Sequence, residues 1–336
     1  MEIFFDYLSN ISDQFIDPKK RIFFIYILIS ILIASLWFIF IKKLTLLESL
    51  RTIFDKKIFF SKSAKSDYKI FFINQLIMML TSPFLVAQLT IATALYYYFH
   101  TLDWLNSGMF NQLPVNYVIL LFTVFQFVLD DFSKFIIHRW MHKWPILWPL
   151  HKVHHSASVL TPMTVFRTHP IEGIIFSLRS SFTQAISISS FIFLFGSSVD
   201  LYTILGVNIF VFLFNIFGSN LRHSHIGIRY WRWLEHILIS PAQHQLHHSI
   251  AVKHYDKNFG STLAIWDWIF GSLHHSVEFE TLKLGINNNK YEKNYDLKYL
   301  YFQPINEIND YIVSKLKKVK NIIMKPFLKG KYLNES

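Results

Sequence analysis

The sequence predicts an all-α fold, a multi-pass membrane helical bundle of about four to five spans with a histidine-rich cap on the cytoplasmic side. Three observations lead to this prediction. Hydrophobic residues make up 52% of the 336 residues, and the mean hydropathy is +0.30. Apolar stretches long enough to cross a bilayer recur along the chain. All sixteen histidines lie between His100 and His275.

The first apolar stretch, residues 22–41, contains no charged residue over twenty positions. About 20 helical residues cross a hydrocarbon core of roughly 30 Å, so this stretch predicts a membrane helix. It is too long for a signal peptide and has no small-residue cleavage pattern after it. The further expected spans are about 70–99 with a kink or break at Pro83, 117–137, 171–195, and 201–217, the last two separated by a turn at 196–198.

Basic residues suggest the orientation of these spans. Segment 42–69 contains eight Lys or Arg, whereas 100–115 and 196–200 contain none. By the positive-inside rule the first segment is cytoplasmic and the other two face outward. This threading places 138–170 and everything after 218 in the cytoplasm, which means the inner face of the inner membrane if the protein is bacterial. It also places the N-terminus outside, which the basic residues at 19–21 oppose.

Composition excludes several classes of function. Cysteine is absent, which removes catalytic thiols, thiolate-ligated haem and cysteine-held iron–sulfur clusters. The ten glycines never occur at Gly-x-Gly spacing, so there is no dinucleotide fingerprint. The net charge of +11 comes mainly from loops between spans and from the tail, which favours an anionic membrane surface over nucleic acid as the partner.

Three domains are expected: N-terminal membrane spans over 1–114, a histidine-box domain over 115–275, and a basic tail over 276–336. In the tail, apolar residues recur at helical spacing with lysines between them. This pattern predicts an amphipathic helix that lies on the membrane or on the domain, or a solvated helix packed on its own protein. The apolar positions are Ile308, Ile312, Leu316, Val319 and Ile323.

The histidines cluster as His-x-x-x-His at 138–142 and as His-x-x-His-His at 151–155 and 244–248. Residues three and four apart share a helix face, so in each box the first histidine should meet the others on one side. Neutral imidazoles bind iron, zinc, copper or nickel. The histidines of a single box could equally be ordinary core or interfacial residues whose ring nitrogens are hydrogen-bonded. Packing alone, however, gives no reason for three such boxes beside a bilayer.

The order of these boxes resembles the fatty acid hydroxylase and sterol desaturase superfamily, over about residues 115–275. Flanking motifs agree with it: Asp131 seven residues before the first box, Arg167-x-His169-Pro170-x-Glu172, Arg222-His223-Ser224-His225, Asp256-Lys257-Asn258-Phe259-Gly260 and Trp266-Asp267-x-x-Phe270-Gly271.

The resemblance implies a membrane-bound lipid oxidoreductase that uses two histidine-ligated iron ions and O2 to hydroxylate or desaturate a C–H bond. The substrate would be a sterol, fatty acyl or ether lipid. Zinc is a possible occupant in the isolated protein. Electrons would come from an external donor of ferredoxin or cytochrome type, because no cytochrome-type motif is fused here. The metal ligands implied are His138, His142, His151, His154, His155, His223, His244, His247 and His248.

Two further histidines, His169 and His225, are possible ligands. For His169 the alternative is substrate positioning or a structural hydrogen bond, and His225 stands where many family members have a different polar residue. Asp131 and Glu172 are candidates to accept a hydrogen bond from a ligand histidine, through the ring nitrogen that does not bind the metal. A plain salt bridge would also explain Asp131. Asn258 is expected to fix the loop under the last box. His100 lies on the predicted outer side and is expected to have no function, and the histidines at 236, 254, 274 and 275 are expected to be structural.

Two rival functions remain. A metal transporter or storage protein would also use histidines, but ion paths need ligands within the spans, whereas the boxes lie at span ends. A scaffold that keeps structural zinc usually needs four ligands, often including cysteine.

Overall fold

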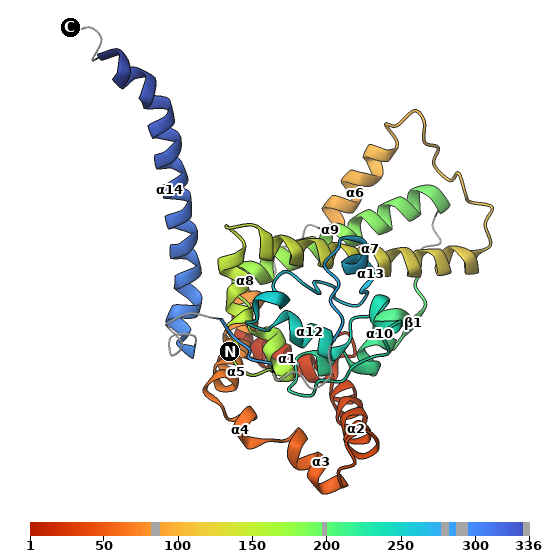
Figure 1. Ribbon diagram of the computed structural model, residues 1–336. Coiled ribbons are helices and arrows are strands. Elements are labelled where there is room, and N and C mark those ends of the chain that lie inside the picture. The colour runs from red at the N-terminus through yellow and green to blue at the C-terminus, as the bar shows by residue number, and fades with distance from the viewer. Residues whose placement is uncertain (82–87, 197–199, 277–281, 287–294, 332–336) are drawn as a thin grey trace.

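The computed structural model describes residues 1–81, 88–196, 200–276, 282–286 and 295–331 (Figure 1). The described chain is mostly helical, as predicted, and the strands are confined to one short hairpin. The α-helices are α1 Glu2–Ile16, α2 Phe24–Phe40, α3 Leu46–Ile53, α4 Lys56–Phe59, α5 Lys62–Thr81, α6 Gln88–Phe99, α7 Val115–Lys143, α8 Trp148–His155, α9 Pro170–Phe195, α10 Ile209–Phe214, α11 Asn220–Arg222, α12 Pro241–His247, α13 Ile265–Ile269 and α14 Leu297–Lys331.

Helix α9 packs along both α6 and α7, and Figure 1 shows these three helices extending together from the rest of the molecule. Aromatic contacts join them, including Phe122 to Phe191 with ring centroids 5.0 Å apart. At the far end, the amides of Gly108 and Phe110 donate to the carbonyls of Phe193 and Leu194. The segment around 108–110 therefore lies against the C-terminal end of α9.

One described helix, α7, is long and apolar enough to cross a membrane, while Phe24–Phe40 and Ile209–Arg222 are shorter apolar helices. Exposed apolar side chains line several of these helices. On α2, Leu28, Leu32 and Leu36 are 43–59% exposed at four-residue spacing. Such a stripe is costly in water and is typical of a surface covered by another apolar phase.

One expected span differs from the structure, and another lies partly outside the described residues. The stretch 70–99 lies on α5 and α6, and its proposed break at Pro83 lies outside the described residues, as do 197 and 198 of the expected turn. The prediction of one helix over 201–217 was wrong. Strands β1 Thr203–Ile204 and β2 Val207–Asn208 pair there, because Leu205 and Gly206 both adopt positive φ and form a tight hairpin turn.

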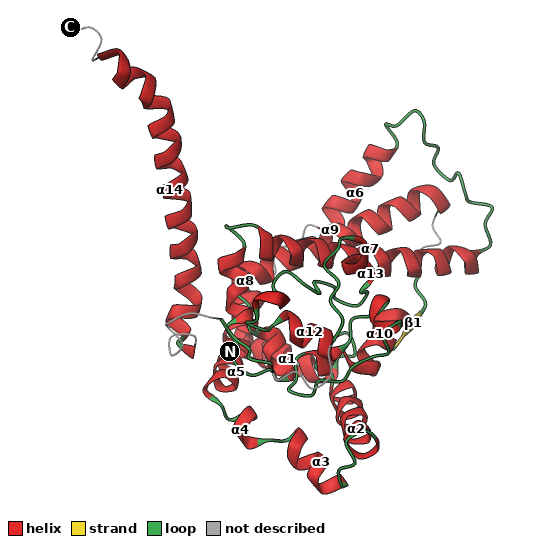
Figure 2. Cartoon of the chain, viewed as in Figure 1, coloured by secondary structure: helices red, strands yellow, loops and turns green. Residues whose placement is uncertain are grey.

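The N-terminal helices pack beneath the histidine-bearing loops. A core of Ala34, Phe38, Ile53, Leu221 and Ile228 joins α2 and α3 to the segment after α10. That segment contains the π-turn Asn215–Ser219, in which Gly218 has φ +134. The chain leaves the apolar helix at this point and enters the loops around α12, which Figure 2 shows in green.

Helix α14 contacts the rest of the protein through its first turns. Leu300 packs on Ile70 and Val153, and Lys152 pairs with Glu307. Beyond these contacts the helix projects away from the other elements (Figure 1). The predicted tail helix is thus present, and the apolar positions Ile312, Leu316, Val319 and Ile323 are 41–63% exposed.

Candidate metal centre

Nine histidines meet in two groups. Their potential ligand atoms lie within 4.8 Å of one another inside each group. The five-histidine group contains His138, His142, His151, His155 and His247; the four-histidine group contains His154, His223, His244 and His248. These are the nine histidines that the resemblance implied, and their binding of metal stays a prediction.

Helix α7 presents His138 and His142 one turn apart near its C-terminal end. Helix α8 begins with Pro149 in its first turn, where proline is preformed for a helix. Helix α12 begins similarly with Pro241 and a capping box between Ser240 and Gln243, which satisfies orphan backbone donors at the helix start. These starts set the rotation of each short helix and hence the direction of its histidines.

The two His-x-x-His-His boxes divide their side chains between the groups. His151 and His155 of α8 join the five-histidine group, whereas His154 joins the other. On α12 the division is reversed, with His244 and His248 in the four-histidine group and His247 in the first. The expectation that one box serves one side was therefore wrong. Successive helical residues are rotated by about 100°, so neighbouring histidines reach different centres.

Three contacts fix the tautomers of the five-histidine group. Nδ1 of His138 lies 2.7 Å from the Phe259 carbonyl, and Nδ1 of His247 lies 2.7 Å from the Lys257 carbonyl. Carbonyls only accept, so both Nδ1 atoms donate and both Nε2 atoms carry lone pairs. Glu172 accepts in the same way from Nδ1 of His151 at 2.7 Å. Outer partners of this kind are typical of metal-bound histidines.

The lone pairs face one another. Nε2 of His138 lies 3.1 Å from Nε2 of His151, and neither atom has a proton to share in this tautomer. Nitrogens bound at about 2.1 Å to one metal lie roughly 3.0–3.4 Å apart, and Nε2 pairs in both groups are separated by 3.0–3.3 Å. Nε2 of His142 and of His247 are buried without a hydrogen-bond partner. The five-histidine group therefore fits a cation, and the Nε2 separations in the four-histidine group are compatible with a second one.

Burial keeps the imidazoles neutral and ready to bind metal. Desolvation lowers the pKa of His247 to about 3 and lowers those of His155 and His248 well below the ordinary value. Neighbouring histidines lower them further, because each added charge would repel the next. A neutral ring needs no proton release before it binds a metal ion.

The four-histidine group has a different electrostatic setting. Nη2 of Arg21 lies 3.1 Å from Nδ1 of His223 and also donates to the Ser219 carbonyl. The buried side chain of Arg222 donates to the Ser261 carbonyl nearby. The four-histidine group is therefore bordered by two guanidinium cations, which only donate hydrogen bonds. The five-histidine group is instead bordered by backbone carbonyls and a carboxylate, which accept them.

A pocket of about 320 Å³ reaches the five-histidine group. His142, His155 and His247 form part of its wall, and Trp148, Ile250 and Tyr255 form another part. No member of the four-histidine group lines it among the described residues. At its rim Asp256, with φ +59, pairs with Lys143 at 2.5 Å.

The two possible ligands lie outside both groups. His169 caps α9, where Nδ1 accepts from the Ile171 amide, and its Nε2 contacts the Tyr301 carbonyl. Nε2 of His225 contacts the Thr52 carbonyl. Both therefore make structural hydrogen bonds, which was one alternative left open for His169. His100 and the expected structural histidines 236, 254, 274 and 275 also lie outside the groups within the described part of the chain.

Asp131 acts on a loop rather than directly on a histidine. It accepts from the amides of Thr262 and Leu263 and from the Trp266 indole, so its predicted contact with a ligand histidine was wrong. Asp267 accepts from the amides of Phe259 and Gly260. Together the two carboxylates hold the segment whose Phe259 carbonyl orients His138.

Asn258 has the loop-fixing position expected of it. Its side chain donates to the carbonyls of Gln243 and His274 and accepts from the His274 amide. Its φ of +55 is a conformation that asparagine tolerates better than most residues.

Sequence reasoning missed Asp67, on α5, and Arg21, in the turn between α1 and α2. Asp67 pairs with Arg167 at 2.7 Å, with both side chains fully buried, and Arg167 also donates to Val153 and Ser156 at the end of α8. No local pattern marks either residue, because their partners lie a hundred or more positions away.

Comparisons with known proteins cover the same region. Residues 123–272 match the model of the family described as fatty acid hydroxylase. A Delta(7)-sterol 5(6)-desaturase of Gibberella zeae is 26% identical over 189 residues, which is 56% of this chain and 50% of the relative. An ornithine lipid hydroxylase of Rhizobium tropici is 28% identical over 163 residues, 47% and 44% respectively.

Human alkylglycerol monooxygenase is 28% identical over 185 residues, which is 55% of this chain and 37% of the relative. The chain thus spans about half the length, or less, of these curated relatives. No solved structure matches the chain.

Proposed function

Since residues 123–272 belong to the fatty acid hydroxylase and sterol desaturase superfamily, we propose that the protein is a membrane-bound lipid oxidoreductase. It would use O2 to hydroxylate or desaturate a C–H bond of a sterol, fatty acyl or ether lipid. The observation that carries the proposal is the pair of buried histidine groups, one of which is open to a pocket.

The five-histidine group would hold one iron ion and the four-histidine group a second. Bound iron would supply the activation of O2 that oxidation of an unactivated C–H bond requires. The protein's own contribution is to hold nine imidazoles in place. The carbonyls of Phe259 and Lys257 and the carboxylate of Glu172 keep the Nδ1 protons on the outer side, so that each Nε2 faces inward.

The pocket beside the five-histidine group would receive the substrate. Its apolar wall includes Trp148 and Ile250, which suits a hydrocarbon chain and excludes water from the reacting carbon. Tyr255, Asp256 and Lys143 at the rim provide polar groups for the end of a lipid. This arrangement assigns substrate contact to the five-histidine side.

The membrane placement is also a proposal. Residues 1–114 would contribute α2, α5 and α6 as membrane helices, and the domain 115–275 would add α7 and α9, while 276–336 forms the basic tail. The bundle end formed by the loops at 100–114 and after Phe195 would face outward. The histidine end would then be the cytoplasmic cap, accessible to an external electron donor.

The test uses His247→Ala and His154→Ala, one from each group, with His236→Ala as the matched control outside both. Purified protein should lose iron in the first two variants, and a deletion strain carrying them should lack the oxidised lipid that the wild-type gene restores. Iron and lipid product retained in both variants would overturn the proposal. Metal uptake by vesicles without O2 consumption would instead favour a transporter.

A further inference from the structure

Helix α14 carries an apolar stripe on its projecting part. Its members are Ile312, Leu316, Val319 and Ile323, which are 41–63% exposed. Successive helical residues are rotated by about 100°, so spacings of three and four residues place all four side chains on one face. An exposed apolar face of this kind is typical of a site that contacts another protein or a membrane.

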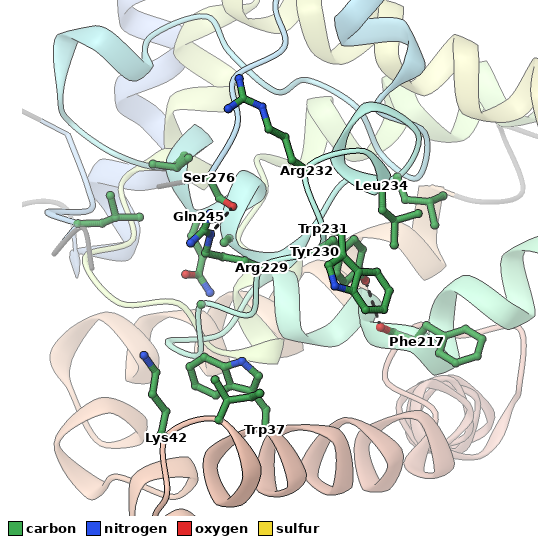
Figure 3. Close-up of a pocket in the computed structure, with 16 residues that line it drawn as sticks. Trp37, Lys42, Phe217, Arg229, Tyr230, Trp231, Arg232, Leu234, Gln245 and Ser276 are labelled. Carbon is green, nitrogen blue, oxygen red and sulfur yellow. Dashed lines mark hydrogen bonds between the residues drawn. The ribbon is translucent and has the colours of Figure 1, made fainter. Parts of the chain in front are cut away.

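The tail packs on its own protein through its first turns. The ion pair of Lys152 with Glu307 lies just before the stripe begins, and the helix then projects away from the other elements (Figure 1). A pocket of about 1040 Å³ lies elsewhere, between the end of α2, the loop 227–234 and α12 (Figure 3). Its described lining contains no residue of α14, so the stripe does not occupy it.

The charge of the projecting part is strongly positive. Lys317, Lys318 and Lys320 are exposed, and within the described part of the chain none of them pairs with an acidic side chain. The sequence after Asp310 contains seven lysines and a single acidic side chain, Glu335. Pairing of that one carboxylate with any one lysine would still leave a large surplus of positive charge.

This charge disfavours a second copy of the chain as the partner. Paired helices usually place Glu opposite Lys beside their apolar seam, whereas α14 has no Asp or Glu after Asp310. Two such helices side by side would bring like charges together, which is destabilising. An anionic lipid surface suits both properties, because it accepts the apolar stripe between its headgroups and attracts the lysines around it.

The place where α14 leaves the protein agrees with such a surface. Leu300 packs on Val153 of α8, so the helix begins at the histidine end of the molecule. In Figure 1 it runs across the direction of α7 and α9 rather than alongside them. On the proposed membrane placement, α7 and α9 span the bilayer, and α14 therefore extends along the cytoplasmic leaflet, whose lipids are partly anionic.

We propose that residues 312–323 of α14 bind the anionic surface of the cytoplasmic leaflet, with the apolar stripe inserted between headgroups and the lysines facing the lipid phosphates. This assigns a partner to the tail, for which the sequence left the membrane, the protein's own domain and solvent open. The inference rests on the membrane placement given under the proposed function. It does not depend on bound metal.

The chain contains no cysteine, so one introduced cysteine can carry a fluorescent label. Val319→Cys places the label in the stripe, and Asn321→Cys, two residues further and about 200° around the helix, places it on the opposite, exposed face. Full-length protein is reconstituted in nanodiscs of phosphatidylglycerol or of phosphatidylcholine. Each contains the same small fraction of a lipid with a quenching nitroxide on its acyl chain.

We expect the label at position 319 to be quenched at least threefold more strongly in phosphatidylglycerol than in phosphatidylcholine. The label at position 321 should be quenched weakly in both lipids. The pair of variants shares the same helix and the same net charge, so a difference between them reports which face of α14 meets the bilayer.

A second variant tests the charges. Lys317→Gln with Lys318→Gln and Lys320→Gln should reduce quenching at position 319 in phosphatidylglycerol to its level in phosphatidylcholine, because each basic residue near an anionic surface strengthens binding roughly fivefold. The matched control makes the same change at three exposed lysines of α5 and should leave quenching unchanged. These lysines are Lys62, Lys65 and Lys69.

Three results would each overturn the inference: equal quenching of the two labels, equal quenching in the two lipids, or unchanged quenching after loss of the three tail lysines. The quenching pattern should persist in His247→Ala, which is expected to lose iron. Loss of iron and lipid oxidation with the pattern intact would therefore contradict only the proposed function. An unquenched stripe in protein that oxidises lipid would contradict only the docking of α14.

Discussion

Glu172 and His151 are joined by a contact of 2.7 Å between Oε1 and Nδ1, with both side chains buried. A carboxylate in this position holds the Nδ1 proton and makes Nε2 a better ligand. His151 is also the ring whose Nε2 contacts both His138 and His155. Glu172 therefore controls the orientation of the ring in the middle of the five-histidine group.

We predict that Glu172→Gln weakens iron binding about 10- to 100-fold, the range for loss of an outer partner of a metal ligand. The amide can turn its NH2 toward His151 and disturb the tautomer. Iron content after dialysis against a chelator measures the effect. Glu307→Gln, which removes the carboxylate that pairs with Lys152, is the control, and equal iron loss in both variants would contradict the prediction.

Arg21→Gln should strengthen iron binding in the four-histidine group, whereas Glu172→Gln weakens it in the five-histidine group. Arg21 donates to Nδ1 of His223, whereas a ring bound to metal through Nε2 needs an acceptor at Nδ1. A glutamine oxygen can provide one. We expect the second iron to leave severalfold more slowly in a chelator time course, with Arg51→Gln unchanged. Faster release at unchanged thermal stability would show that Arg21 supports the site instead.

Gly260→Ala should disturb the centre through packing alone. A Cβ at this position would lie 2.5 Å from the Leu263 carbonyl and 2.9 Å from Asp267. Backbone and carboxylate must shift, at a cost of roughly 1–3 kcal/mol, and the Phe259 carbonyl then moves away from His138. Thermal unfolding and iron content would both fall. In Gly271→Ala, where a Cβ meets nothing within 4 Å, stability should fall but iron should remain.

Ile250→Trp should block the pocket beside the five-histidine group without removing metal. Ile250 lines that pocket, and the larger ring would occupy space needed by a lipid chain. Lipid turnover should fall at least tenfold while iron content stays at the wild-type level. Val252→Trp, at a position 80% exposed, is the control. Normal turnover in Ile250→Trp would place substrate entry elsewhere.

The metal-free protein should lose stability as the pH falls. The pKa of His247 is lowered to about 3 in the folded chain, whereas an unfolded histidine titrates near 6.5. Between these values the unfolded state binds the extra proton, so stability decreases by up to about 1.4 kcal/mol per pH unit for this residue. Melting temperatures of metal-free protein at pH 7.5 and 5.0 would measure the slope. His247→Leu should reduce it and His236→Leu should not.

The sequence by itself determined the helical class and the nine histidines that meet. The spacing of eight of them within three boxes is a local property, because residues three and four apart share a helix face whatever surrounds the helix. The ninth, His223, lies in no box and was indicated by the family resemblance. The apolar stretch of α7 was equally local.

Only the tertiary structure decided how the histidines are divided between two groups, and which residue contacts the outer ring nitrogen of each. The division depends on the rotation of α8 and α12, which is set where each helix begins and by what it packs against. Asp131 supports the 259–266 loop, His169 and His225 bond to carbonyls, and Arg21 reaches His223 from 202 positions away. The hairpin at 203–208 replaced an expected helix, since apolar composition does not distinguish a strand pair from a helix when positive φ at 205 and 206 forms the turn.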